Sequence, residues 1–282
     1  MPIAVINART TPSLRPPRAV RLKRIHFEAS LEALDSCVLL FAPREDAMAG
    51  YYGLATLSGL EPDLAHPGFM FAQLQDFRPF ATAVKPSDDG QPFEHEAQGD
   101  EGALKWWTYA AGIRFIDETT FAAILAAANP REQSGFDEVV RQFPAPDEPD
   151  APILVSSLRR KRDAKLRMAV LPHYGPGCAL SRLRLPAMNG REEVEVCHLR
   201  ALEYGGSDEI RNAMPMARTV HWAFDNGLIG LENDGTVLFA PAAPPVFRAL
   251  FYGQRRAVFP RDPNAWPDPE SLKFHRHEVF GR

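Results

Sequence analysis

The sequence has few cysteines and no closely spaced pair of them. Only Cys37, Cys178 and Cys197 occur in 282 residues. An odd number at wide spacings gives no support for a disulfide framework, and without a CxxC pair a structural zinc knuckle is not expected. Free cysteines of this kind suit a reducing compartment, so we expect a cytoplasmic protein.

Long apolar runs are also missing. None approaches the ~20 residues that a membrane-spanning helix needs, and the first 24 residues hold no apolar stretch of signal-peptide length. We therefore expect no membrane partner. Residues 1–24 are rich in proline and arginine and predict a flexible basic arm. A tail without a role of its own is the alternative.

The chain has no overall positive charge. Its net charge of −4 argues against a uniformly basic nucleic-acid binder, but the charges are segregated. Residues 157–170 predict a helix in which Asp163 is the one acidic residue. Such a helix either contacts phosphates or is a solvated face. Its candidate DNA-binding residues are Arg159, Arg160, Arg162, Lys165 and Arg167.

Proline and acidic residues concentrate in the middle of the chain, between residues 128 and 152. Proline favours extended, non-helical chain, so this stretch predicts a linker between two domains. The whole chain, with 45% hydrophobic and 24% charged residues, has the composition of a globular protein, and either half is long enough to bury its own core. We expect an arm at 1–24, domains at 25–130 and 156–282, and a linker at 131–155.

The N-terminal half contains short strand-like runs separated by turn signals. Residues 36–42, 51–57, 69–74 and 113–116 are apolar runs of strand length, and a capped helix is expected at 121–128. Together they predict a small barrel-like β domain with a few helices, and an α+β class for the whole chain.

The sequence of the C-terminal half predicts a series of short elements. After the basic helix come a turn at 174–181, a strand at 194–199, a glycine-bearing loop at 204–208 and a short helix at 219–226. A hairpin at 227–239, turning at an Asn-Asp-Gly, completes the order.

Three residues in this half have types suited to phosphodiester hydrolysis. His198 ends the strand, Asn212 lies in the loop, and His221 opens the short helix with Asp225 one turn later. A neutral imidazole is a suitable base near pH 7, and a His and a carboxylate at i and i+4 make a two-ligand clamp for a divalent ion. Taken singly, each is more commonly a structural residue.

The stretch 167–239 resembles HNH (ββα-metal) endonucleases of restriction systems. These have a strand ending in His, a glycine-rich loop, Asn, and then His-x-x-Phe-Asp-x-Gly. The end of the chain, 272–280, also resembles the close of such domains. The matching residues are Tyr174, Cys178, Glu195, His198, Gly205, Gly206, Asp208, Asn212, His221, Phe224, Asp225 and Gly227.

The resemblance implies that His198 is the general base, Asn212 a positioning residue and His221 a ligand of Mg, Mn, Ni or Zn. Many HNH enzymes carry an acidic or histidine ligand where this chain has Cys197. A thiolate is a poor ligand for magnesium, so Cys197 is either a ligand of a softer ion or a buried strand residue. Glu195 and Asp225 are the other ligand candidates.

The N-terminal half resembles, more weakly, the PUA-like (EVE, ASCH and SRA) readers of modified bases. The similarity lies in residues 42–44, 51–55, 71, 76–77, 113–116 and 121. Such a domain would flip a base into an aromatic pocket. Tyr51, Trp106 and Trp107 are the candidate stacking residues, and Asp76 the acceptor for a cytosine amino group. The alternative is that these aromatics form the domain core.

These features predict a modification-dependent DNA endonuclease that reads a modified base, a cytosine derivative being the first candidate, and cuts double-stranded DNA with one divalent metal. Because each HNH centre cuts one strand, double-strand cleavage requires a homodimer or two binding events. Two alternatives stay open: a nuclease whose reader recognises another nucleic-acid feature, and a DNA-binding protein with a degenerate catalytic site.

Overall fold

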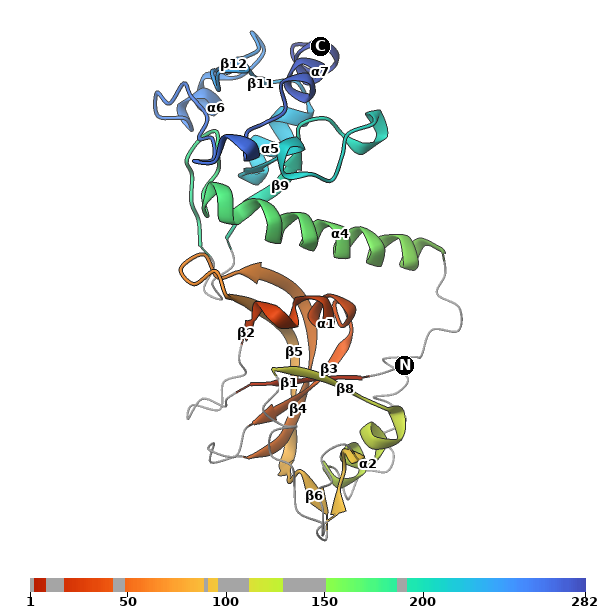
Figure 1. Ribbon diagram of the computed structural model, residues 1–282. Coiled ribbons are helices and arrows are strands. Elements are labelled where there is room, and N and C mark those ends of the chain that lie inside the picture. The colour runs from red at the N-terminus through yellow and green to blue at the C-terminus, as the bar shows by residue number, and fades with distance from the viewer. Residues whose placement is uncertain are drawn as a thin grey trace. The chain divides into compact units, whose positions relative to one another are not determined.

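The computed structural model describes residues 3–8, 18–42, 49–88, 91–95, 112–128, 151–186 and 192–282, with backbone alone at 151–157. The chain divides into two compact units (Figure 1). Unit 1 comprises Met1–Asp63 and Gly68–Lys161, and unit 2 comprises Leu64–Pro67 and Arg162–Arg282. None of the helices in these described ranges is long and apolar enough to cross a membrane.

Unit 1 is built on a six-stranded sheet with the order β2-β5-β4-β3-β1-β8. β1 pairs with β3 in parallel and the other neighbours are antiparallel. The long strands β4 and β5 shift register at three places, and the sheet curls strongly (Figure 1). The strands are β1 (Ile3–Asn7), β2 (Ala19–Lys23), β3 (Cys37–Ala42), β4 (Gly50–Pro62), β5 (Phe69–Val84) and β8 (Ile113–Ile116).

The described part of unit 1 also contains the helices α1 (Phe27–Glu32) and α2 (Glu118–Ala128) and a small ladder of β6 (Ser87–Asp88) and β7 (Gln91–Pro92). The strands expected from the apolar runs and the helix before residue 128 are thereby confirmed, as is the mixed α+β class. Helix α2 packs Ile124 and Leu125 against Leu39 and Phe41 of the sheet.

The expectation of a flexible arm at 1–24 is wrong for β1 and β2, which are both strands of the sheet. β1 lies between β3 and β8, and Ala4, Val5 and Ile6 are at most 1% exposed. The apolar run of β1 is only five residues long, and the prolines and arginines after it dominated the sequence pattern. A short run buried on both faces has no alternating pattern that could reveal it as a strand.

Unit 2 begins within the long helix α4 (Ala151–Tyr174), which extends the expected basic helix at both ends. The elements that follow keep the expected order of strand, loop, helix and hairpin. They are β9 (Glu195–His198), β10 (Ala213–Met216), α5 (Arg218–Asp225), β11 (Ile229–Leu231) and β12 (Val237–Phe239), then α6 (Pro245–Ala249) and α7 (Pro269–Glu278).

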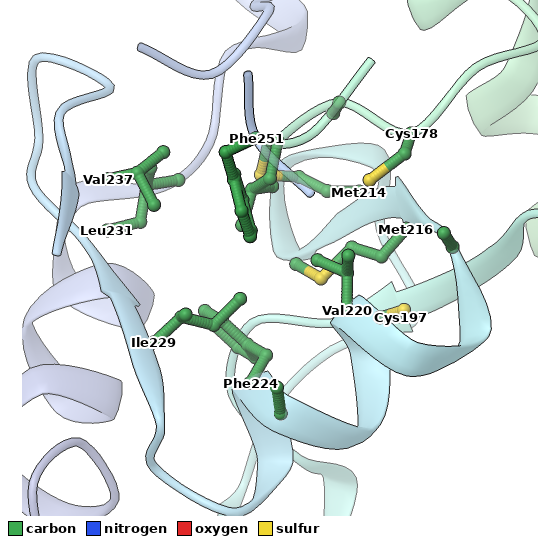
Figure 2. Close-up of a cluster of buried hydrophobic side chains, with 14 of the residues drawn as sticks. Cys178, Cys197, Met214, Met216, Val220, Phe224, Ile229, Leu231, Val237 and Phe251 are labelled. Carbon is green, nitrogen blue, oxygen red and sulfur yellow. The ribbon is translucent and has the colours of Figure 1, made fainter. Parts of the chain in front are cut away.

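One face of helix α5 packs against the hydrophobic core of unit 2. Phe224, on its last turn, lies among Ile229, Val220 and Met216 (Figure 2). The ring of His275 from α7 stacks on Phe224 at 3.5 Å between centroids, and its Nε2 donates to the Phe224 carbonyl at 2.9 Å. The helix therefore presents its other face outward on a rigid support.

Glycine is required where α5 ends. Gly227 has a φ of +69°, and a Cβ there would lie 2.3 Å from the Val279 carbonyl oxygen. The Gly281 amide donates to the Gly227 carbonyl, so the end of the chain closes over this turn. The turn residue of the His-x-x-Phe-Asp-x-Gly motif is thus explained by backbone geometry.

Candidate active site

Two short strands place the first part of the site. β9 and β10 are antiparallel, with His198 opposite Ala213 and Glu195 opposite Met216. His198 is the last residue of β9, and its side chain is 18% exposed. A residue at a strand end faces the loops, where ligands can approach it, while the preceding residues pack in the sheet.

Asn212 closes the loop that connects the two strands. Its side chain is buried, with Oδ1 accepting from the Arg200 amide at 3.0 Å and Nδ2 donating to the carbonyls of Arg200 at 2.9 Å and Ser207 at 2.8 Å. All three of these hydrogen bonds are made with backbone groups. These bonds tie the side chain of Asn212 to the loop that follows His198.

The glycines of this loop are needed for the same closure. A Cβ on Gly206 would lie 1.9 Å from the Arg200 carbonyl oxygen and 2.8 Å from Asn212 Nδ2. Gly205 has a φ of +79°, in the left-handed region. The backbone therefore passes directly over Arg200, and no larger residue fits at position 206.

The loop returns a carboxylate to His198. Asp208 Oδ1 lies 2.8 Å from His198 Nε2, and Arg162 Nε lies 3.8 Å from the other Asp208 oxygen. A carboxylate accepts, so the neutral imidazole donates Nε2–H and keeps its lone pair on Nδ1. The sequence motif included Asp208, but nothing in the pattern assigned it this role.

Helix α5 carries the second histidine. Its first amide, on Arg218, donates to Glu193 Oε1 at 2.9 Å, which satisfies one of the groups left open at a helix N-terminus. His221 follows one turn later and contacts two carboxylates: Nδ1 lies 2.9 Å from Glu195 Oε2, and Nε2 lies 3.1 Å from Asp225 Oδ2. Glu195 thereby links β9 to α5.

The charges around His221 favour its protonated form. Burial lowers the pKa of His221, but the hydrogen bonds and charges of Asp225 and Glu195 outweigh burial, and the pKa lies above the ordinary 6.5. A site that attracts a proton this way also attracts a metal cation. The two bind to the same lone pair and compete for it.

Cys197 lies in the hydrophobic core of unit 2, together with Cys178 and Met214 (Figure 2). It is 1% exposed, and burial, followed by the charges of Asp225 and Glu195, raises the pKa of its thiol well above the usual value. A neutral thiol is a poor metal ligand. This placement agrees with the interpretation of Cys197 as a buried strand residue.

The basic residues of α4 divide into two groups. Arg159, Arg160 and Lys165 have exposed positions, and Arg162 is half-buried. Arg167 is half-buried as well, and its guanidinium donates to the carbonyls of Val194 and Glu192. Arg167 therefore holds the chain that enters β9. The bonds to Val194 and Glu192 use two of the five N–H donors of the guanidinium.

The candidate reader residues are only partly described. Tyr51 is fully buried in unit 1, with its hydroxyl donating to Glu94 at 2.5 Å and its ring edge-on to Phe41 and Phe93. This is the position that the core alternative gives it. Asp76 is exposed on β5 with a φ of +52°, where β4 and β5 shift register. Trp106 and Trp107 lie outside the described residues.

The possible metal donors at α5 are one imidazole nitrogen and one carboxylate. Over the described ranges, no group of three or more His, Cys, Asp or Glu side chains is arranged to hold a metal ion. His221 and Asp225 nevertheless offer two neighbouring donors 3.1 Å apart. Cations of the magnesium type bind through one or two protein groups and take their other ligands from water and phosphate oxygens.

Two contributors to the site were not assigned roles by the sequence. Arg218 Nε lies 3.0 Å from Glu195 Oε1, and Asp208 contacts His198. Their spacing in the sequence follows no known ligand pattern. The signal for Asp208 was its place in the loop beside Asn212, and for Arg218 there was none.

Comparison with known proteins gives a family match within the second half of the chain. Residues 178–232 match the model of the HNH endonuclease family. No curated protein sequence gives a significant match. Among solved structures, the chain is similar to a modification-dependent TagI restriction endonuclease, with 15% identity, a TM-score of 0.36, and coverage of 96% of this chain and 73% of that one.

A second similar structure is the Type IV phosphorothioation-dependent restriction endonuclease ScoMcrA, at 12% identity and a TM-score of 0.23. It covers 89% of this chain and 56% of that one. The family match contains both histidines, Asn212 and each of the three carboxylates that contact the histidines. The chain therefore contains an HNH endonuclease domain, within residues 178–232.

Proposed function

We propose that this protein is a metal-dependent DNA endonuclease that hydrolyses phosphodiester bonds with the HNH domain and selects modified DNA with unit 1. One observation carries the nuclease part. Within the family match, two histidines on one strand-strand-helix unit are each held by a carboxylate, one at a strand end and one on the helix.

The roles follow from the contacts. Because Asp208 accepts from Nε2–H, His198 keeps a lone pair on Nδ1 and can take a proton from an attacking water. Asn212 is a positioning residue, since it fixes the loop that carries Asp208. His221 and Asp225 would hold a divalent ion, and such an ion would supply positive charge to offset the negative charge that builds on the phosphate and the leaving oxygen.

DNA is the substrate to which the charge distribution is suited. Arg159, Arg160 and Lys165 have exposed positions on α4, and Arg218 is 66% exposed beside His221. Phosphate contacts of this type position the duplex without reading its sequence. Selectivity then has to come from another part of the chain, and we assign it to unit 1 because of its sequence resemblance to PUA-like readers, with modified cytosine as the first candidate base.

The test is cleavage of paired phage DNAs, one with ordinary and one with modified cytosine, in Mg²⁺, Mn²⁺ and Ni²⁺. We expect cleavage of the modified DNA that disappears on chelation and in the His198→Ala variant. Equal cleavage of both DNAs would keep the nuclease and remove the modified-base reader. Binding without cleavage in every metal would favour a DNA-binding protein with a degenerate site.

A further inference from the structure

The imidazole of His221 lies between two carboxylates. Glu195 Oε2 is 2.9 Å from Nδ1, and Asp225 Oδ2 is 3.1 Å from Nε2. A neutral imidazole has one N–H and one lone pair, so it can donate to only one of the two. The remaining nitrogen and carboxylate both present lone pairs. They require a cation at that side, which is either the second proton of the imidazolium form or a metal ion that takes its place.

The Glu195 side is already supplied with positive charge. Its second oxygen, Oε1, lies 3.0 Å from Arg218 Nε, so the guanidinium and the imidazole N–H use both oxygens of the carboxylate. A permanently charged guanidinium at this distance repels a divalent ion. Glu195 is thus suited to accept Nδ1–H and unsuited to bind the metal.

The Asp225 side has the opposite properties. Asp225 is 54% exposed, and its ion pair with His221 is the one contact of its carboxylate recorded among the described residues. Two neighbouring ligands of an octahedral ion with bonds of 2.0–2.1 Å lie about 3 Å apart. The Nε2 to Oδ2 distance of 3.1 Å already matches that separation.

We propose that Glu195, held by Arg218, is a positioning residue for the metal: it fixes His221 in the Nδ1–H tautomer and directs Nε2, with Asp225, towards the ion. The inference rests on the proposed function, since it concerns the ion of the same domain. A carboxylate on the far nitrogen of a metal-bound histidine orients the ring and increases the basicity of the ligand.

The first experiment measures Mn²⁺ binding to the full chain by calorimetry. We expect Glu195→Ala to weaken binding by about 10–100-fold, as loss of an outer-shell partner does. Glu195→Gln should lose less, because the amide oxygen still accepts from Nδ1–H. Glu193→Ala is the matched control, since Glu193 caps α5 without contacting His221, and it should bind as the wild type does.

Circular dichroism and thermal unfolding of each variant separate misfolding from loss of the ion. Wild-type affinity in a folded Glu195→Ala variant would overturn the inference while leaving the proposed function intact. Equal losses in Glu195→Gln and Glu195→Ala would overturn it too, because they would make the charge of Glu195 the quantity that matters. Absence of Mn²⁺ binding in the wild type would instead contradict the proposed function itself.

A second measurement needs neither variant nor metal. Long-range ¹H–¹⁵N spectra of the metal-free wild type, at a pH where the ring is neutral, identify which nitrogen of His221 carries the proton. The inference predicts Nδ1–H, with His221→Gln used to assign the signal. An Nε2–H tautomer would overturn it whether or not the protein cuts DNA.

Discussion

His198 ends a strand and contacts one carboxylate, Asp208, whereas His221 lies inside a helix between two, Glu195 and Asp225. The first depends on a loop closed by backbone hydrogen bonds, and the second on a helix packed onto a hydrophobic core. The same side chain is thereby prepared for two tasks. We propose that one imidazole acts on the substrate and that the other holds a cation.

We expect the largest change in Mn²⁺ affinity from a substitution of His221. His221→Ala removes a direct ligand, so we expect Mn²⁺ affinity to fall by more than the ~100-fold that loss of an outer-shell partner costs. Cleavage should fall with it. Titration calorimetry and a cleavage assay on the same preparation check both. A variant that binds Mn²⁺ as the wild type does would remove His221 from the metal site.

Near His198, the loop backbone at Gly206 tolerates no added side chain. Gly206→Ala places a Cβ 1.9 Å from the Arg200 carbonyl oxygen, so the loop that carries Asp208 must move. A displacement of about 1 Å can cost about 100-fold in rate, and we expect a loss of that order in cleavage with Mn²⁺ binding retained. Gly68→Ala is the control: like Gly206 it has no positive φ, and a Cβ there meets nothing within 4 Å.

Asn212→Ala tests the same loop through stability. It leaves the Arg200 amide and two carbonyls without their side-chain partner, at about 1–3 kcal/mol for each buried group left unpaired. We expect the free energy of unfolding in urea to fall by about 3 kcal/mol. Asn226→Ala, an exposed residue with one bond to the Trp222 carbonyl, should change it far less. Equal effects would contradict the buried role of Asn212.

The smallest expected effect is on the pH dependence of the free energy of unfolding. It has opposite signs for His221 in α5 and for His275, which packs against α5. Burial lowers the pKa of His275, so its contribution is complete above about 6.5, the unfolded value, and is lost as the pH falls below it. The raised pKa of His221 gives stability that is complete below about 6.5 and lost as the pH rises through the folded value.

We therefore expect His275→Gln to reduce the acid-side loss of unfolding free energy, and His221→Gln to reduce the loss on the alkaline side. Urea denaturation from pH 5 to 8 with a chelator present measures both. If the two substitutions shift the pH profile in the same direction, the assigned surroundings of one histidine are wrong.

The sequence predicted the second half of the chain better than the first. In unit 2, the residue pattern around the two histidines and Asn212 was sufficient to predict the order of strand, loop, helix and hairpin. Each of these residue types lies in a short local element that the pattern identifies. The partners of the histidines were harder to predict. Glu195 and Asp208 reach them across 26 and 10 residues, through a strand pairing and a loop closure that no local pattern specifies.

In unit 1, local signals identified the strands but not their arrangement. β1 pairs with β3 and β8, which lie far along the chain, and its five residues gave no periodic pattern. Tyr51 shows the limit for function, because an aromatic residue in a strand has the same sequence signature in a core as in a binding pocket. Here its hydroxyl contacts Glu94, which also pairs with Arg114.

We propose that His198 acts on the substrate while His221 holds the ion, and the His198→Ala variant separates these two roles most directly. Single-turnover cleavage of modified DNA and Mn²⁺ binding should be measured on the same folded variant. We expect wild-type Mn²⁺ affinity with cleavage about 10²–10⁴-fold slower, the usual contribution of a general base. Cleavage at the wild-type rate, or loss of the ion together with activity, would contradict this division between the two histidines.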